Sequence, residues 1–377
     1  MIYLDNAATT KPLDILKELA AAHAADGWMN PSAMYPPAVE KGAVLKAARA
    51  AICAPLRARD AVFTSCGTES ANTVIFGGWK RQGKKPLHFI TSVYEHPCVY
   101  ESFRTLEAMG HTVDYAEPES DGSIHAKDVA ELVRDDTALV SIMHVNNETG
   151  AINDIAAIAA AVKAKNPLTA FHADGVQGYI KEPFDMARSK VDYYTVSAHK
   201  IHGIKGAGAI FMNKAPRPYI IGGGQEGGVR SGTENTLGIE MFAAAADYMY
   251  KNRDEVTRNI AAARAALLGA LSDVPDVVML SPENGAEHIL NLSFPGIRGE
   301  VLLHLLERDG IYISTGSACS SKKGRISRAH KAMRLDAATA EGSVRISFSK
   351  DNTEEESQTA ALAIKKALAQ YRGFIRR

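Results

Sequence analysis

Short apolar strands alternate with longer helical patterns along most of this chain, and that alternation limits the folds open to it. Strand-like runs lie at 61–65, 87–91, 138–145, 168–173, 193–196 and 208–212. The run at 138–145 is apolar enough to be buried on both faces, and an alanine-rich helix is expected around 154–165. The pattern predicts an α/β fold whose mostly parallel sheet is flanked by helices. Ligands bind beyond the carboxyl ends of the strands in such sheets.

A second, smaller domain is expected after a bridging helix. An amphipathic pattern at 254–271 has the apolar stripe Val256, Ile260, Ala263, Leu267 and Leu271. After Pro275 the pattern changes to short strands and helices, which indicates an α+β domain. Residues 353–356 have the sequence of a capping box that opens the last helix. The expected domains are a large one at 16–252 and a small one made of 1–15 and 253–377.

Composition argues against several classes of partner. The chain has 377 residues with 43 Lys and Arg against 43 Asp and Glu, so its net charge predicts neither a nucleic-acid nor a membrane partner. No apolar run approaches the roughly 18 residues of a transmembrane helix, and the N-terminus has no signal-peptide pattern. The four cysteines, Cys53, Cys66, Cys98 and Cys319, form no CxxC pair, which fits a reducing cytoplasm without disulfides or zinc. The first three are assigned to packing, although Cys66 directly precedes a candidate helix start.

A lysine at the end of a strand is the first candidate for chemistry. The run at 193–196 leads into Ser-Ala-His-Lys at 197–200 and a glycine-rich segment at 201–208. A lysine next to a buried strand is unfavourable unless it has a partner or a chemical role. Lys200 therefore fits an amine held for a Schiff base with a carbonyl cofactor, although a solvated strand-end lysine is the ordinary alternative.

An anion site is expected at the helix start that follows the first of these strands. The first amides of the helix predicted at 67–70 have no internal partners, its dipole favours an anion, and Thr68 adds a hydroxyl. Taken alone, the motif is better explained as an ordinary N-cap. Ser197 and His199 beside the lysine, and Thr233 in a glycine-rich segment, could supply further phosphate contacts.

Three more polar residues follow predicted strands. Asp174 could pair with a protonated pyridine nitrogen, which turns the ring into an electron sink, or it could cap a helix. His96 could lie on the face of a ring and move protons near neutral pH, or it could be a structural histidine. Asn147 could hydrogen-bond a phenolic oxygen or a substrate carboxylate, or form an Asx turn.

Together these motifs resemble those of the cysteine desulfurases, pyridoxal 5′-phosphate (PLP) enzymes that are similar to class V aminotransferases. The resemblance covers almost the whole chain in order, at 3–10, 67–72, 95–96, 144–150, 174–177, 197–200, 230–233, 316–319 and 344–347. It implies a fold-type I PLP-dependent transferase with a mostly parallel seven-stranded sheet in the large domain and a smaller α+β domain. The spacing from Cys319 to Arg345 resembles the group with the longer catalytic loop.

The resemblance also implies roles around the cofactor. Lys200 would bind PLP covalently and later move protons at the substrate α-carbon. Asp174 would keep the pyridine nitrogen protonated, Gln177 would contact the phenolic oxygen, and His96 would stack on the ring. The implied cofactor-binding residues are Gly67, Thr68, His96, Asn147, Asp174, Gln177, Ser197, His199, Lys200 and Thr233.

Contacts to a second subunit and to the substrate are implied in the same way. Thr233 would reach the phosphate from the partner of a homodimer. Arg345 and Asn147 would bind the α-carboxylate of L-cysteine, since the arginine fork matches a carboxylate. A surface arginine on a strand is the alternative for Arg345.

Cys319 is expected to carry sulfur. It lies in 314–324, a segment of small residues typical of a mobile loop, and Lys322 and Lys323 beside it would lower its pKa. The resemblance implies that its thiolate attacks the substrate sulfur, which releases L-alanine and leaves a persulfide on Cys319. An inert buried cysteine fits this polar segment poorly.

The sulfur acceptor is expected to be another protein. No acidic residue occurs between Gly310 and Leu335, a stretch whose basic residues are Lys322, Lys323, Arg325, Arg328, Lys331 and Arg334. These residues could attract an acidic acceptor surface, by family analogy that of an iron–sulfur scaffold or a tRNA-thiolation enzyme. A solvated basic helix face is nearly as good an explanation.

Other functions stay open. A selenocysteine lyase or a related class V aminotransferase would use the same cofactor residues, although an aminotransferase does not need Cys319. A non-enzymatic scaffold or regulator is disfavoured because the catalytic residues implied by the resemblance are all present. One segment departs from the family pattern: Ala33 and Tyr35 replace a serine and a histidine near the expected cofactor mouth, so we expect an effect on substrate access.

Overall fold

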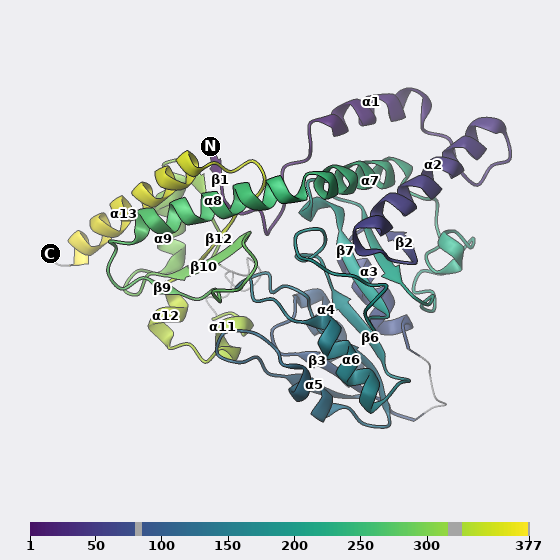
Figure 1. Ribbon diagram of the computed structural model, residues 1–377, viewed down its shortest axis with the longest axis horizontal. Coiled ribbons are helices and arrows are strands. Elements are labelled where there is room, and N and C mark those ends of the chain that lie inside the picture. The colour runs from purple at the N-terminus through teal and green to yellow at the C-terminus, as the bar shows by residue number, and fades with distance from the viewer. Residues whose placement is uncertain (80–84, 316–325, 376–377) are drawn as a thin grey trace.

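The chain folds into two parts that lie side by side (Figure 1). The computed structural model describes residues 1–79, 85–315 and 326–375. The larger part is built on a seven-stranded sheet and the smaller part on a three-stranded sheet, with a further two-stranded pair. This is the expected α/β fold. No helix in the described ranges is long and apolar enough to cross a membrane.

The large sheet is mostly parallel. Its strands are β2 (Asp60–Thr64), β3 (His88–Ser92), β4 (Thr112–Ala116), β5 (Thr137–Ser141), β6 (Ala170–Asp174), β7 (Tyr193–Ser197) and β8 (Gly208–Met212). They lie in the order β2-β8-β7-β6-β5-β3-β4, and β8 runs antiparallel to both of its neighbours. The other neighbouring pairs are parallel, so the carboxyl ends of β3, β5, β6 and β7 meet at one edge.

The sequence predicts all of these strands except β4. That strand is mostly half-exposed and carries no fully apolar run, so it lacks the signal of a buried strand. The apolar run at 138–145 is a strand only as far as Ser141. Residues 142–145 remain buried but form the loop that follows β5.

Helices flank the large sheet (Figure 1). They are α1 (Ile15–Asp26), α2 (Pro36–Cys53), α3 (Gly67–Gly77), α4 (Pro97–Ala108), α5 (Ala126–Leu132), α6 (Ile155–Lys165) and α7 (Thr236–Lys251). Short 3-10 turns occur at η1 (Ala54–Leu56), η2 (Ala198–Lys200) and η3 (Glu226–Gly228). The predicted helix at 154–165 is confirmed as α6, with Asp154 as its N-cap.

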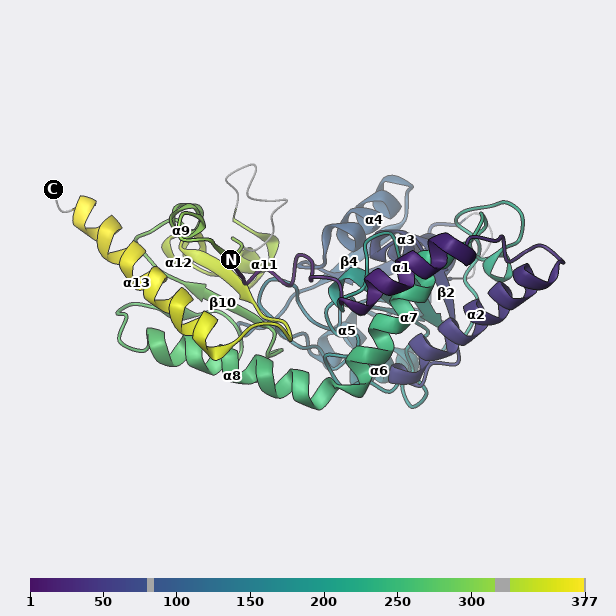
Figure 2. The same ribbon diagram turned by 90° about the horizontal axis from the view of Figure 1, so that it is seen from above.

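The smaller part is α+β, as expected. Its strands are β1 (Ile2–Tyr3), β9 (Val278–Met279), β10 (Ile289–Ser293), β11 (Ile311–Tyr312) and β12 (Ser343–Ser347). Its helices are α8 (Arg253–Leu271), α9 (Gly299–Glu307), α11 (Arg328–Ala332), α12 (Ala337–Glu341) and α13 (Glu354–Ile375). Helix α8 runs directly on from α7 and packs along α13 (Figure 2).

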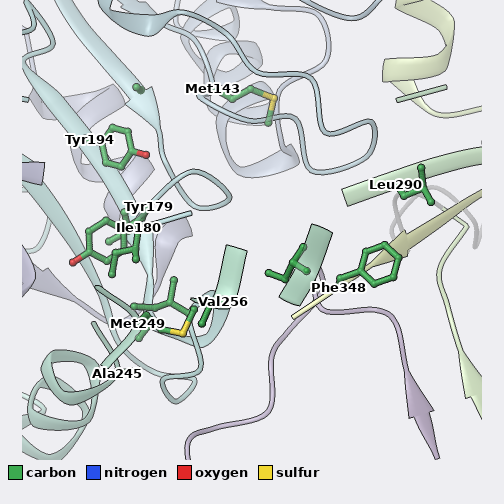
Figure 3. Packing of buried hydrophobic residues seen from close by; sticks show 14 of the residues in the cluster. Met143, Tyr179, Ile180, Tyr194, Ala245, Met249, Val256, Leu290 and Phe348 are labelled. Carbon is green, nitrogen blue, oxygen red and sulfur yellow. The ribbon is translucent and has the colours of Figure 1, made fainter. Parts of the chain in front are cut away.

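The hydrophobic core is continuous between the two parts. The predicted stripe of α8 is buried along its whole length, from Val256 to Leu271. Val256 belongs to the same buried cluster as Tyr194 of the large sheet and Phe348 of the smaller part (Figure 3). Burial of apolar surface therefore holds the two parts together as well as each part by itself.

The N-terminal segment connects the two parts a second time. It starts in the smaller part, where β1 pairs with β11, and then crosses to α1 in the larger part (Figure 2). On the way the Thr10 amide donates to the His199 carbonyl, just before Lys200. We propose the domain boundaries expected from the sequence, with 16–252 as the large domain and 1–15 together with 253–377 as the small one. The pairing of β1 with β11 supports them, because it joins the N-terminal strand to the smaller part.

The capping box at the start of α13 generates a stability prediction. The Glu356 amide donates to Thr353 Oγ1 at 3.1 Å, and the Thr353 amide donates to Glu356 Oε2 at 3.4 Å. Thr353→Ala should lower the free energy of unfolding by about 1 kcal/mol, because a helix-end amide loses its acceptor. Urea denaturation measures this, with Thr359→Ala, an exposed change inside the same helix, as the control. Equal effects of the two changes would contradict the capping role.

Candidate active site

A cavity of about 310 Å³ lies at the carboxyl edge of the large sheet. It is lined by residues that follow β2, β3, β5, β6 and β7, and by Arg345 of β12. The sequence-predicted residues that line it are Gly67, Thr68, His96, Asn147, Asp174, Gln177, Ser197, His199, Lys200 and Arg345. Motifs that are far apart in the sequence therefore meet around one space.

Lys200 is held at this cavity by the N-terminal segment. It ends η2, directly after β7, and its Nζ donates to the carbonyl oxygens of Ala7 at 2.6 Å and Ala8 at 2.7 Å. Desolvation, together with the positive charge of Arg345, lowers the pKa of Lys200 to about 8. Its amine therefore loses its proton far more readily than an exposed lysine does, which suits covalent chemistry with a carbonyl.

Asp174 is the last residue of β6 and is almost fully buried. Its Oδ1 accepts a hydrogen bond from the Val176 amide at 2.9 Å. Burial raises the pKa of Asp174 to about 6, against the opposing effects of that hydrogen bond and of the Lys200 charge. A buried carboxylate needs a cation or a donor as partner, so this position suits a protonated ring nitrogen.

His96 caps the start of α4 and faces the cavity. Its Nδ1 accepts from the Cys98 amide at 3.2 Å and lies 3.0 Å from Cys98 Sγ. Desolvation by the surrounding protein and the positive charge of Lys200 lower the pKa of His96 to about 4. The ring of His96 is exposed to solvent beside the cavity, which leaves room for a flat ring to stack on it.

The expected phosphate side of the cavity combines a helix start with unpaired donors. Helix α3 begins at Gly67, as predicted, and Cys66 Sγ accepts from the Glu69 amide at 3.5 Å as its N-cap. Ser197 Oγ is buried and has no hydrogen-bond partner among the described residues. His199 Nδ1 lies 3.1 Å from Thr9 Oγ1, and desolvation lowers the pKa of His199 to about 4. An anion would satisfy the Ser197 hydroxyl and the free helix amides.

Arg345 is buried, so the alternative of a surface strand arginine is wrong. Its guanidinium donates to the Asn147 carbonyl at 2.9 Å and to Asp5 Oδ1 at 2.6 Å. The Asp5 carboxylate is thus already seated on the fork that a substrate carboxylate would use. Sequence reasoning misses Asp5, because the two residues are joined only by the fold.

One expected residue lies elsewhere, and another is outside the described residues. Thr233 does not line this cavity: it is exposed and borders a separate pocket with Arg230 and Glu226. Exposure at that place is compatible with contact to a second subunit. Cys319 lies outside the described residues, as do Lys322 and Lys323.

Sequence reasoning also misses several groups that line the cavity. The carbonyls of Ala7 and Ala8 hold Lys200, but a backbone carbonyl has no sequence signature. Cys98 packs against a core cluster, as expected, and it also lines the cavity beside Cys66. Ala33 and Tyr35 do not line the cavity of the single chain. Their effect on substrate access stays a prediction.

Comparison with known proteins identifies the family. Residues 2–359 match the sequence model of the family described as Aminotransferase class-V. The chain belongs to the class-V aminotransferase family. Among curated members, a NifS/IcsS protein homolog from Lactobacillus delbrueckii subsp. bulgaricus is 38% identical over 366 residues, which cover 95% of this chain and 94% of the relative. A protein from Nostoc sp. named cysteine desulfurase is 36% identical over 366 residues, which cover 94% of this chain and 90% of the relative.

Solved structures of class-V relatives have the same fold. A NifS-like protein superposes with a TM-score of 0.91 at 34% identity, covering 98% of this chain and 99% of the other. A structure described as SspA in complex with cysteine superposes with a TM-score of 0.83 at 30% identity, covering 92% of this chain and 99% of the other. The agreement extends over both parts of the fold.

PLP is the cofactor of this family, and the residues present fit it. The buried, unpartnered Ser197 hydroxyl and the start of α3 suit a phosphate. Asp174 offers a buried carboxyl for the ring nitrogen, and Lys200 offers an amine of lowered pKa. The cavity thus contains residues suited to the phosphate, the ring nitrogen and the aldehyde group of PLP.

The Ser197 hydroxyl has no partner among the described residues, so its removal can distinguish an effect on stability from an effect on cofactor binding. Ser197→Ala should leave the unfolding free energy of the cofactor-free protein nearly unchanged, because no hydrogen bond to a described residue is lost. The same change should weaken binding of PLP roughly tenfold or more, because a hydrogen bond to a charged phosphate is lost.

Ser92→Ala is the matched control for this experiment. Ser92 Oγ donates to Glu95 Oε1 at 2.7 Å, so its loss should destabilise the cofactor-free protein by about 1 kcal/mol. Urea denaturation gives the stabilities and a fluorescence titration gives the affinities. A Ser197→Ala protein that is destabilised but binds PLP normally would exclude the phosphate role.

Proposed function

We propose that this protein is a PLP-dependent cysteine desulfurase, which converts L-cysteine to L-alanine and keeps the sulfur as a persulfide on Cys319. The observation that carries the proposal is the meeting of Lys200, Asp174 and Arg345 around one cavity. An amine, an acid and a carboxylate-binding fork are the groups that PLP chemistry on an amino acid requires. Relatives named cysteine desulfurase support this choice among class-V activities.

Lys200 is the proposed proton carrier. Bound to it, PLP supplies an electron sink that stabilises negative charge at the α-carbon of an amino acid. The Lys200 amine, whose pKa is about 8 in the cofactor-free protein, would take and return a proton near neutral pH when it is not attached to the cofactor. Asp174 would hydrogen-bond the ring nitrogen and keep the sink electron-poor, and His96, which lines the same cavity, would cover the ring face.

Arg345 is the proposed anchor for the substrate α-carboxylate, with Asn147 beside it. The guanidinium now holds the Asp5 carboxylate, and a substrate carboxylate can take its place with the same geometry. Anchoring the carboxylate orients the amino group toward Lys200, since both side chains line the same cavity.

The sulfur step needs a nucleophile and no external oxidant. The Cys319 thiolate forms a bond to the substrate sulfur while the bond from that sulfur to the substrate Cβ breaks. The Cβ gains a proton and becomes the methyl group of alanine, and the transferred sulfur stays on Cys319 as a persulfide. Lys322 and Lys323, next in sequence, favour the thiolate form.

The proposal includes a homodimer, an acceptor protein and a cytoplasmic location. Thr233 is exposed outside its own cavity, which supports a contact with the partner's cofactor. The acceptor is an iron–sulfur scaffold or a tRNA-thiolation enzyme. Within the basic stretch, Arg328 donates to the Glu95 carbonyl at 3.0 Å, so it serves the fold, whereas Arg334 forms only an exposed surface pair with Glu117 at 3.2 Å. Lys331 is exposed and stays available for an acceptor.

The role of Lys200 is tested by trapping. Borohydride treatment of the PLP-loaded protein should fix the cofactor to Lys200, and Lys200→Ala should lose both the fixed cofactor and alanine production. Peptide mass analysis measures the attachment site. Lys205→Ala, on a neighbouring lysine that does not line the cavity, is the control and should behave like the parent. Cofactor fixed on Lys205 would overturn the assignment.

The role of Cys319 is tested with the substrate. Cys319→Ala should bind PLP and respond to L-cysteine in its absorption spectrum, yet form no persulfide and little alanine, because the thiol acts only at the sulfur step. Mass spectrometry detects the added sulfur, and Ser320→Ala is the control in the same segment. Full alanine production by Cys319→Ala with an added thiol reductant would contradict the role.

A further inference from the structure

A second lysine, Lys181, lies close to the cofactor cavity. A cavity of about 500 Å³ adjoins the first, and Lys200 borders both. Lys181 lines this second cavity, between the large part and the N-terminal turn of α8, where Arg253 also lies. The cysteine desulfurase proposal assigns Lys181 no task.

Lys181 contacts the cofactor cavity through Gln177. Its Nζ donates to Gln177 Oε1 at 3.2 Å, and Gln177 Nε2 donates to the Ala7 carbonyl at 2.9 Å. The same Ala7 carbonyl accepts from Lys200 Nζ at 2.6 Å. A chain of hydrogen bonds thus leads from Lys181 through the Gln177 amide to the carbonyl that holds Lys200.

The direction of the Gln177 amide depends on its partners. An amide can present either its oxygen or its NH₂ group to a given side. While Lys181 is an ammonium it has donors only, so it requires the oxygen on its own side. Desolvation and the positive charge of Lys200 lower the pKa of Lys181 to about 7, against the opposing charge of Glu182, so this requirement is strongest below neutral pH. The NH₂ group of Gln177 is then left for the other side, where the Ala7 carbonyl and the cofactor cavity lie.

Close packing and a strained residue fix the backbone of the turn that precedes Lys181. A Cβ on Gly175 would lie 1.9 Å from the Tyr194 ring, and one on Gly178 would lie 2.3 Å from His144, so the turn that carries Gln177 packs at close range. Ile180 has φ = 67°, which is strained for a β-branched residue. Its side chain is buried in the cluster that includes Tyr179 and Met249 (Figure 3), and this packing holds the strained turn in place.

We propose that Lys181 is a positioning residue that fixes the Gln177 amide with its NH₂ group toward the phenolic oxygen of PLP. The inference rests on the proposed function, in which Gln177 meets that oxygen. A donor at the phenolic oxygen stabilises its negative form. The pH at which the bound cofactor changes its absorption spectrum therefore depends on the Gln177 donor, and through it on Lys181.

The experiment is a double-mutant cycle read by absorption, with PLP-loaded proteins titrated over pH. Lys181→Met should raise the midpoint of the spectral titration by roughly half to one pH unit, the size of one hydrogen bond to the cofactor. Lys181→Arg retains a cation with donors only and should stay close to the parent. In the Gln177→Met background, Lys181→Met should add no further shift.

The double-mutant cycle distinguishes a positioning role of Lys181 from a direct effect of its charge. If Lys181 acted only through its charge, Lys181→Met would shift the midpoint equally in the parent and in the Gln177→Met background, and the proposal would be wrong. An unchanged midpoint in Lys181→Met would also overturn it. Both single variants should take up PLP, because neither removes Lys200.

A crystal structure of cofactor-free Lys181→Met gives a readout independent of the cofactor. We expect the Gln177 side chain to leave the Ala7 carbonyl, whereas a retained contact between Nε2 and that carbonyl would refute the positioning role. If the parent protein takes up no PLP, the proposed function fails, while this structure still decides whether Lys181 sets the amide.

Discussion

The contact of the Lys200 amine with the carbonyls of Ala7 and Ala8 ties the site to the whole fold. Lys200 comes from the end of a large-sheet strand, whereas the two carbonyls belong to a segment that begins in the smaller part. The contact exists only when the continuous core has brought the two parts together. Arg345 on β12 depends on the same segment, because Asp5 is its partner.

Burial sets the electrostatics of the site in two opposite directions. Removal from water disfavours charge, so it lowers the pKa of Lys200 to about 8 and raises the pKa of Asp174 to about 6. The pKa of Lys200 is thereby brought close to neutral pH, as proton-transfer chemistry requires. The raised pKa of Asp174 disfavours an unpaired carboxylate, so a cationic partner is needed to hold its charge. One physical cause thus shifts the pKa values of these two side chains in opposite directions.

Local patterns explain what could be predicted from the sequence. The strand around Thr195 is buried at every residue and the strand around Val140 at all but one, so their apolar runs are clear, whereas half-exposed β4 has no such run. Lys200 and Asp174 follow strands, and strand ends meet at one edge of a parallel sheet. Asp5 and Lys181 could not be predicted, because their roles arise from contacts made only after folding. No pattern marks a carbonyl such as that of Ala7.

We propose that buried Asp174 keeps the ring nitrogen of the cofactor protonated beside Lys200. The most direct measurement is the nitrogen NMR shift of ring-¹⁵N-labelled PLP bound to the parent protein and to Asp174→Asn. We expect the shift of a protonated pyridine in the parent at pH 8, and that of an unprotonated pyridine in Asp174→Asn, because an amide cannot hold the charge. An unprotonated shift in the parent, or the same shift in both proteins, would contradict the claim.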